Sequence, residues 1–246
     1  MENNTFPQQP TTTYGPQSGS STRTFLSSVF SYMTTALVIS GVMAWWFGTD
    51  MGMQAWLRHI DARGIGSPTI LGYVVMFAPL ILVFVMGGMV QRLSSTVMLG
   101  IFLLYSAMTG MSLSTIFLIY TGATVAKVFF MSAGLFAIMA FAGYTTKTDL
   151  TKLGSILMIG LIGIVVGSLI NMFIGSSSFD YIITIVGVIV FTGLTAYDMQ
   201  KLKIMGEQIE TGTETASKMA LMGALSLYLD FINLFLMLLR LFGRKD

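Results

Sequence analysis

Cysteine is missing from the chain, histidine occurs once, and charged residues are few. Without cysteine there can be no disulfide bonds, thiolate metal sites or cysteine nucleophiles. His59 alone cannot build a site with several histidine ligands. Only 10% of the 246 residues are charged, whereas soluble domains have roughly 25%. With 54% hydrophobic residues, the chain is too apolar to cover itself with polar surface, which indicates a membrane protein in a lipid bilayer.

Charge of one sign is not concentrated anywhere, and the net charge is only +2. The basic residues are spread along the chain, so no nucleic-acid partner is expected. Residues 1–24 contain three of the five prolines and almost no aliphatic side chains. This composition is typical of a disordered polar tail.

The remainder of the chain, residues 25–243, consists of long apolar runs separated by short polar joints. A helix needs about 20 apolar residues to cross the hydrocarbon core of a bilayer. Seven runs meet that length, which predicts an all-α integral membrane domain with seven transmembrane helices. The predicted spans are residues 25–48, 70–90, 97–120, 124–144, 153–174, 180–200 and 219–241.

Basic residues near the span ends predict the orientation. Seven lie on the N-terminal side and three on the other, so the N-terminus is expected in the cytoplasm. Arg240, Arg244 and Lys245 join the outer side if the last segment spans, and the inner side if it re-enters. Its length favours a span, whereas the charge rule favours re-entry. The two groups of basic residues are Arg23, Arg92, Lys147, Lys152, Lys201, Lys203 and Lys218, and Arg58, Arg63 and Lys127.

Two aspartates fall inside predicted spans, where a charge costs roughly 2.5–3.5 kcal/mol at the centre. Asp198 lies near the inner end of the sixth span, and Asp230 lies near the middle of the seventh. Helical spacing gives each a polar stripe. Ser226 and Asn233 share a face with Asp230, and Thr195 shares a face with Asp198. Facing stripes on helices adjacent in sequence would bring the two carboxyl groups close together.

Two carboxylates in a poorly solvated site do not readily both ionise, because burial and like charge oppose it. The pair is therefore expected to share a proton and to titrate as a unit near physiological pH. Carboxylate and amide oxygens suit a hard cation such as Ca²⁺. The residues alone thus predict a pH-switched cation site at Asp198 and Asp230. A purely structural role in helix contacts is the alternative for Ser226 and Asn233. For Asp198 the alternative is a plain surface carboxylate near the membrane interface.

No enzymatic activity and no cofactor are expected. The chain has no nucleotide-binding loop, histidine cluster or nucleophile elbow. An intramembrane aspartyl protease needs two aspartates, which Asp198 and Asp230 could supply. Asp230, however, stands in YLDF and not beside glycine, as the GxGD-type setting of such enzymes requires.

Three stretches of the chain resemble the transmembrane Bax inhibitor motif family. The C-terminal string ALSLYLDFINLFLMLLRLFG (224–243) is the most specific, and TAYDMQ (195–200) resembles the family's second motif. Arg92 precedes Gly110 by eighteen residues, as an arginine does in a bacterial calcium-leak member. The resemblance implies a seven-helix bundle around a central C-terminal helix.

For bacterial members, the resemblance also implies a pH-sensitive calcium leak channel in the inner membrane. The aspartates matching Asp198 and Asp230 would share a proton, and Arg92 would latch onto the first. One departure concerns the outer entrance, where the leak member has a glutamate and this chain has Ile81. A second branch of the family implies an alternative function. Its members modulate a membrane-bound, ATP-dependent protease through protein–protein contact. In this chain, residues 1–24 could serve as the segment that binds the protease.

Overall fold

The computed structural model describes residues 17–60 and 66–243 and is almost entirely helical. Within these residues, seven helices are long and apolar enough to cross a membrane, which confirms the predicted class. A short helix and a two-stranded hairpin between the first two spans were not predicted. The elements are α1 (Gln17–Thr49), α2 (Met51–Leu57), β1 (Arg58–Ile60), β2 (Gly66–Pro68), α3 (Ile70–Gly88), α4 (Ser95–Leu113), α5 (Ile116–Ile119), α6 (Gly122–Thr145), α7 (Thr151–Ile174), α8 (Ser177–Gln208) and α9 (Glu214–Phe242).

Helix boundaries follow from local capping chemistry. Thr69, Ser94, Thr121 and Thr213 each precede a helix and accept a backbone N–H from its first turn through the side-chain oxygen. Gly175 ends α7 with a φ of 68°, a left-handed conformation that glycine adopts without steric cost. Short polar joints between apolar runs are therefore sufficient to start and stop these helices.

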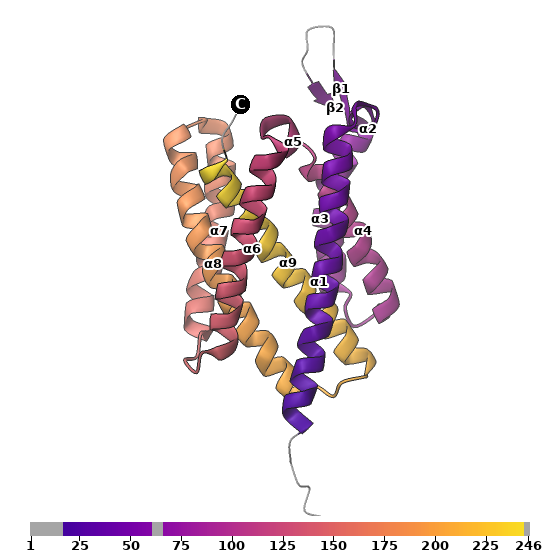
Figure 1. The fold of residues 1–246 in the computed structure, drawn as a ribbon, viewed down its shortest axis with the longest axis vertical. Coiled ribbons are helices and arrows are strands. Elements are labelled where there is room, and N and C mark those ends of the chain that lie inside the picture. Colours follow the sequence, from indigo (N-terminus) through magenta and orange to yellow (C-terminus); the bar gives the residue numbers. More distant parts are fainter. Residues whose placement is uncertain (1–16, 61–65, 244–246) are drawn as a thin grey trace, which may run out of the picture.

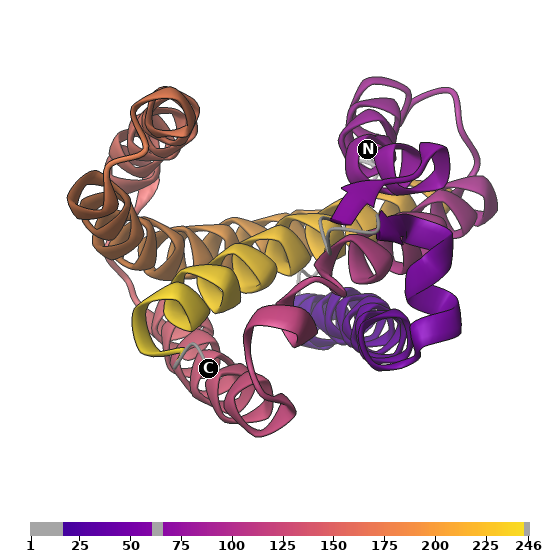
Figure 2. The same ribbon diagram turned by 90° about the horizontal axis from the view of Figure 1, so that it is seen from above.

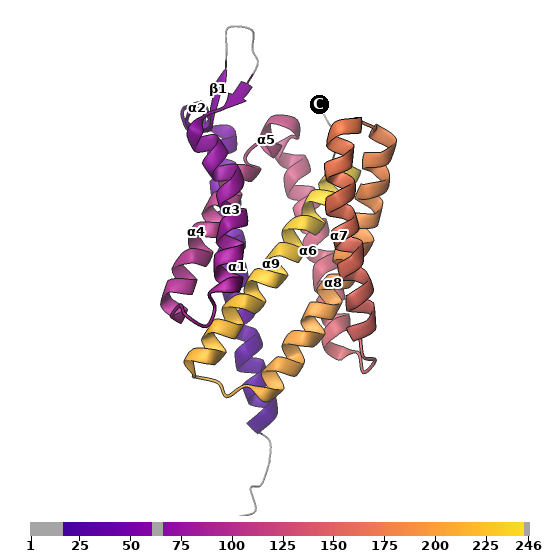
Figure 3. The ribbon, with the colours of Figure 1, turned by 180° about the vertical axis from the view of Figure 1, so that it is seen from behind.

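The helices form two groups that α9 joins. One group holds α1, α3 and α4, and the other holds α6, α7 and α8 (Figure 1). α9 runs diagonally between them and packs against α1, α4, α6 and α8, as the views from above and behind also show (Figures 2 and 3). It is the most buried of the seven spanning helices, with 67% of its most apolar stretch inside. The C-terminal helix is therefore central, as the family resemblance implied.

α9 crosses the bundle completely, so re-entry of the last segment is wrong. The helix is continuous over 29 residues, a length of about 43 Å at 1.5 Å per residue. Arg240 near its C-terminus forms an ion pair of 3.6 Å with Asp180 at the start of α8, at the end of the bundle opposite the N-terminus. Arg240 thus faces the side away from the N-terminus, while Arg244 and Lys245 lie outside the described residues.

The first helix begins earlier than the sequence pattern indicated. α1 starts at Gln17, so residues 17–24 of the expected polar tail are helical, and residues 1–16 lie outside the described part. Thr22 and Phe25 are buried and pack beside Gly206 of α8. This packing stabilises a helical turn whose polar composition alone would not predict one. We refer to this end of the bundle as the N-terminal side.

Candidate functional site

Asp198 of α8 and Asp230 of α9 meet inside the bundle. Their carboxyl groups lie close enough to act on each other electrostatically. Asp230 is only 6% exposed, and Asp198 is half-buried. The two aspartates selected from the sequence are therefore brought together by the helices that carry them.

Hydrogen bonding around the pair is unequal. The hydroxyl of Ser226, one helical turn before Asp230, donates to Oδ2 of Asp198. Oδ2 of Asp230 is buried and has no hydrogen-bond donor among the described residues. Two carboxylates cannot donate to each other unless one carries a proton. A shared proton would therefore supply the donor that this buried oxygen lacks.

A cavity lies beside the pair, on the N-terminal side. It has a volume of about 270 Å³ and is bordered by α3, α8 and α9. Asp198, Ser226 and Lys201 line it together with apolar residues that include Val83 and Met222. Lys201 is exposed and attracts the Asp198 carboxylate electrostatically. Asp198 is thus the member of the pair that a solvated ion could approach first.

Close contact between α8 and α9 fixes this geometry. Of all pairs of elements, these two share the most extensive contact. At Gly223 of α9, a Cβ atom would collide with the side chain of Leu202 on α8. The absence of a side chain at Gly223 lets the helices approach one turn before Ser226, where the polar contact begins.

Two residues expected to support the pair form no hydrogen bond to it within the described chain. The hydroxyl of Thr195 donates to the carbonyl of Phe191 at 2.8 Å, and the Asn233 amide donates to the carbonyl of Leu229 at 2.8 Å. Both of these hydrogen bonds therefore lie within the residue's own helix. Of the predicted polar stripe, only Ser226 reaches an aspartate.

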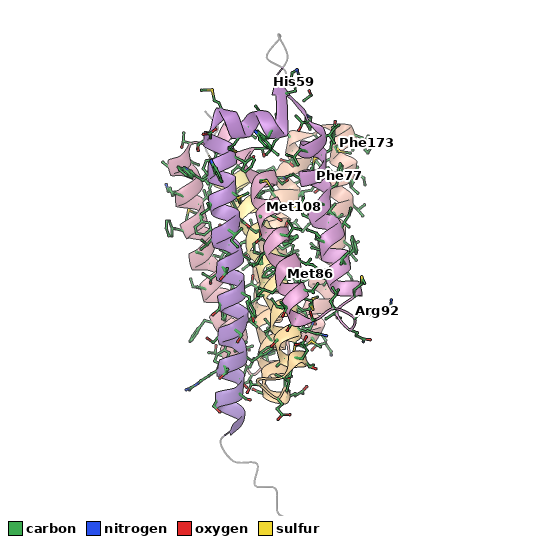
Figure 4. All side chains as sticks on the ribbon, turned by 90° about the vertical axis from the view of Figure 1, so that its right-hand side faces the viewer. His59, Phe77, Met86, Arg92, Met108 and Phe173 are labelled. Atoms are coloured by element: carbon green, nitrogen blue, oxygen red, sulfur yellow. The ribbon has the colours of Figure 1, made fainter. Side chains whose placement is uncertain are left out.

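The predicted latch between Arg92 and Asp198 is not formed in this structure. Arg92 lies in the joint between α3 and α4, where its exposed side chain extends away from the bundle (Figure 4). It makes no ion pair with any residue of the described chain. The position of the joint at the surface explains this difference, since Asp198 faces α9 and already accepts from Ser226.

The site offers few ligands for a tightly held metal ion. Among the described residues, no group of three or more His, Cys, Asp or Glu side chains could hold one. Ca²⁺ takes 6–8 oxygen ligands. The two carboxyl groups supply only part of such a shell, so the site suits a passing hydrated cation better than a bound one.

A second buried polar cluster lies on the other side of α9 and was missed by the sequence reasoning. The Ser40 hydroxyl donates to the carbonyl of Ser106 at 2.7 Å and lies 2.6 Å from the hydroxyl of Tyr228. Tyr228 packs edge-on against Tyr105, with ring centroids 5.5 Å apart. These contacts hold α1, α4 and α9 together. Ser40 and Tyr228 are 188 residues apart, so no local pattern reveals the contact.

Comparison with known proteins places the chain in a family. The family model described as "Inhibitor of apoptosis-promoting Bax1" matches residues 22–246, nearly the whole chain. The chain belongs to the Bax1 inhibitor family. Among Bax1 inhibitor relatives, the "Inner membrane protein YbhL" of Escherichia coli K12 is 45% identical over 91% of this chain and 92% of its own length.

Other bacterial relatives are similarly close. A Borreliella burgdorferi protein is 42% identical over 90% of this chain and 92% of its own length. A Rickettsia prowazekii protein is 40% identical over 91% of this chain and 90% of its own length. The predicted membership of the Bax1 inhibitor family is therefore confirmed. None of these names states an enzymatic activity, and the expectation that the chain is not an enzyme stays a prediction.

Proposed function

We propose that this protein is a pH-sensitive calcium leak channel, gated by a proton shared between Asp198 and Asp230. We place it in the bacterial inner membrane with the N-terminus in the cytoplasm, as the basic residues predict. The observation that supports the proposal most directly is the meeting of two carboxyl groups from α8 and α9 in the bundle interior. Intramembrane carboxyl groups usually mark an ion or proton pathway.

The gate follows from the chemistry of the pair. With one shared proton, the carboxyl groups attract each other and hold α8 against α9. Loss of that proton leaves two like charges in a buried site, which favours separation or attraction of a cation. The cavity beside Asp198 gives the cation a route from the N-terminal side.

The structure corresponds to a closed channel in this proposal. Beyond Asp230, towards the other end of the bundle, Leu234 is completely buried and Phe231 and Leu238 are nearly so. These side chains fill the path along α9. Opening would require α9 to shift against its neighbours, and we propose that Arg92 latches onto Asp198 in a second closed conformation, different from this one.

Calcium flux from vesicles tests the proposal. Full-length protein in Ca²⁺-loaded vesicles should release Ca²⁺ at a rate that changes with pH, and Asp198→Asn and Asp230→Asn should each abolish most of that pH response. Asp180→Asn is the matched control, because this exposed aspartate of α8 lies away from the pair. If the latch operates in another conformation, Arg92→Gln should also raise the leak.

The absence of any leak from verified, inserted protein at every pH would contradict the channel. It would favour the alternative, in which the protein modulates a membrane-bound, ATP-dependent protease. In that case a protease should co-purify with the full chain and be lost when residues 1–24 are deleted.

A further inference from the structure

An apolar groove lies on the flank of the bundle, away from the aspartate pair. It measures about 440 Å³, within the range of about 300–1,000 Å³ typical of small-ligand sites. Phe30 and Leu37 of α1 form one wall, and Ala137 and Tyr144 of α6 form the other. Met199 and Phe231 contribute from α8 and α9.

The groove exists because α1 and α6 do not pack closely together. Each packs against α8 and α9, and the space between them stays open along the surface of the bundle. Ala137 and Phe141 on its wall are exposed. Because these helices span the membrane, the groove faces the hydrocarbon of the bilayer.

One end of the groove carries a positive charge. Lys203 lies one helical turn after Met199 on α8, and its Nζ donates to the carbonyl of Tyr144 at 3.0 Å. The same ammonium lies 5.3 Å from the centre of the Tyr144 ring. Within the described chain, its other N–H groups have no acceptor, and it forms no ion pair with an acidic residue. Glu207, one turn further along α8, is exposed.

Two further basic residues lie at the same end. Arg23 precedes Phe30 by seven residues, which puts it on the same face of α1, about 10 Å nearer the N-terminus. Lys147 follows the last residue of α6 by two positions, beside Tyr144 in sequence. Both side chains are exposed. The N-terminal end of the groove therefore carries Lys203, and Arg23 and Lys147 are basic residues of the same end of the bundle.

We infer that this groove binds an anionic phospholipid, with an acyl chain between α1 and α6 and the phosphate at Lys203. The chemistry matches each part of such a molecule. An apolar channel at hydrocarbon depth suits the chain, and basic side chains at its interfacial end suit the phosphate. Each basic residue near a membrane surface contributes on the order of a fivefold gain in binding anionic lipid. This site does not depend on the proposed channel.

Lipid retention measured by native mass spectrometry tests the inference. Full-length protein in neutral detergent is mixed with palmitoyl-oleoyl phosphatidylglycerol or with phosphatidylethanolamine of the same chains. Wild type should retain phosphatidylglycerol preferentially, and Lys203→Gln should weaken that binding about fivefold. Lys201→Gln is the control, since Lys201 lies on the same helix but lines the other cavity.

A groove-filling variant tests the acyl chain separately. Ala137→Phe should reduce retention of both lipids, because its ring occupies the groove. Ala142→Phe makes the same change at an exposed position of α6 outside the groove and should have no effect. If Ala137→Phe does not insert, the ratio between the two lipids for Lys203→Gln still tests the phosphate site.

Two outcomes would overturn the inference. One is that wild type retains phosphatidylglycerol and phosphatidylethanolamine equally, and that Lys203→Gln does the same. The other is a photoreactive residue at position 137 that crosslinks, in native membranes, to a protein and not to lipid. The second result would show that a partner helix occupies the groove.

Discussion

Ser226 of α9 donates a hydrogen bond to the Asp198 carboxylate of α8, and this contact joins the two helices that carry the aspartate pair. It lies one turn from Asp230. Of the two aspartates, Asp198 therefore has a hydrogen-bond donor from the facing helix, whereas Oδ2 of Asp230 has none among the described residues. The stability of the α8–α9 interface should depend both on this hydroxyl and on the protonation of the pair.

Replacement of Ser226 by alanine should destabilise the protein. A hydrogen bond to a charged group is worth about 1.5–3 kcal/mol, and the half-buried setting of Asp198 favours the lower value. We expect Ser226→Ala to lower the Tm in detergent by a few degrees. Ser226→Thr retains the hydroxyl and should stay close to wild type. An unchanged Tm for Ser226→Ala would show that the contact contributes nothing to the interface.

The pair should make stability depend on pH. Two ionised carboxylates in one buried site repel each other, whereas a pair with one proton does not. The Tm of the wild type should therefore fall as the pH is raised from acidic to alkaline. Asp230→Asn removes one of the charges and should flatten this dependence. Parallel Tm curves for the two proteins would contradict a shared proton.

α1 and α4 approach each other closely at Gly110. A Cβ atom there would collide with the backbone oxygen of Ser40 and lie 2.8 Å from Cβ of Met43. Gly110→Ala should thus lower the Tm, even though alanine favours helix by up to about 1 kcal/mol over glycine. Gly100→Ala in the same helix meets no atom within 4 Å and should be neutral or stabilising. Equal effects of the two changes would disprove the close approach.

Hydrogen bonds join the first turn of α9 to the first turn of α4. Glu214 accepts the backbone N–H of Ser95 at 2.6 Å and its hydroxyl at 2.7 Å. Glu214→Ala should accelerate hydrogen exchange at the first turn of α4. Glu210→Ala, in the same joint, removes an exposed carboxylate that forms no hydrogen bond to α4 in the described chain, and it serves as the control. Unchanged exchange in both variants would mean that the contact does not protect this turn.

The natural absence of cysteine allows the orientation to be tested with single thiols. Thr148→Cys lies in the joint between α6 and α7 on the N-terminal side, and Ser178→Cys lies at the opposite end, at the start of α8. With the N-terminus in the cytoplasm, an impermeant maleimide should label only Ser178→Cys in intact cells. The reverse pattern would invert the proposed orientation. Labelling of both from one side would contradict the number of spans.

The seven spanning helices were predictable because the bilayer imposes a simple rule on composition. A run of about 20 apolar residues has few alternatives to a spanning helix. The structure differs from the sequence-based prediction where tertiary contacts extend a helix beyond its apolar run. Residues 17–24 become helical because Thr22 and Phe25 pack against α8, and the last segment spans although the charge rule favoured re-entry.

The sequence by itself determined the membrane class, the family and the two intramembrane aspartates, because apolar runs, motif strings and isolated charges are local features. Only the tertiary structure decided which side chains contact the two aspartates. Asn233 and Thr195 share a helical face with an aspartate but bond within their own helices, and Arg92 faces away. Helical spacing fixes which side chains lie on one face, whereas rotamers and interhelical packing fix which of them touch.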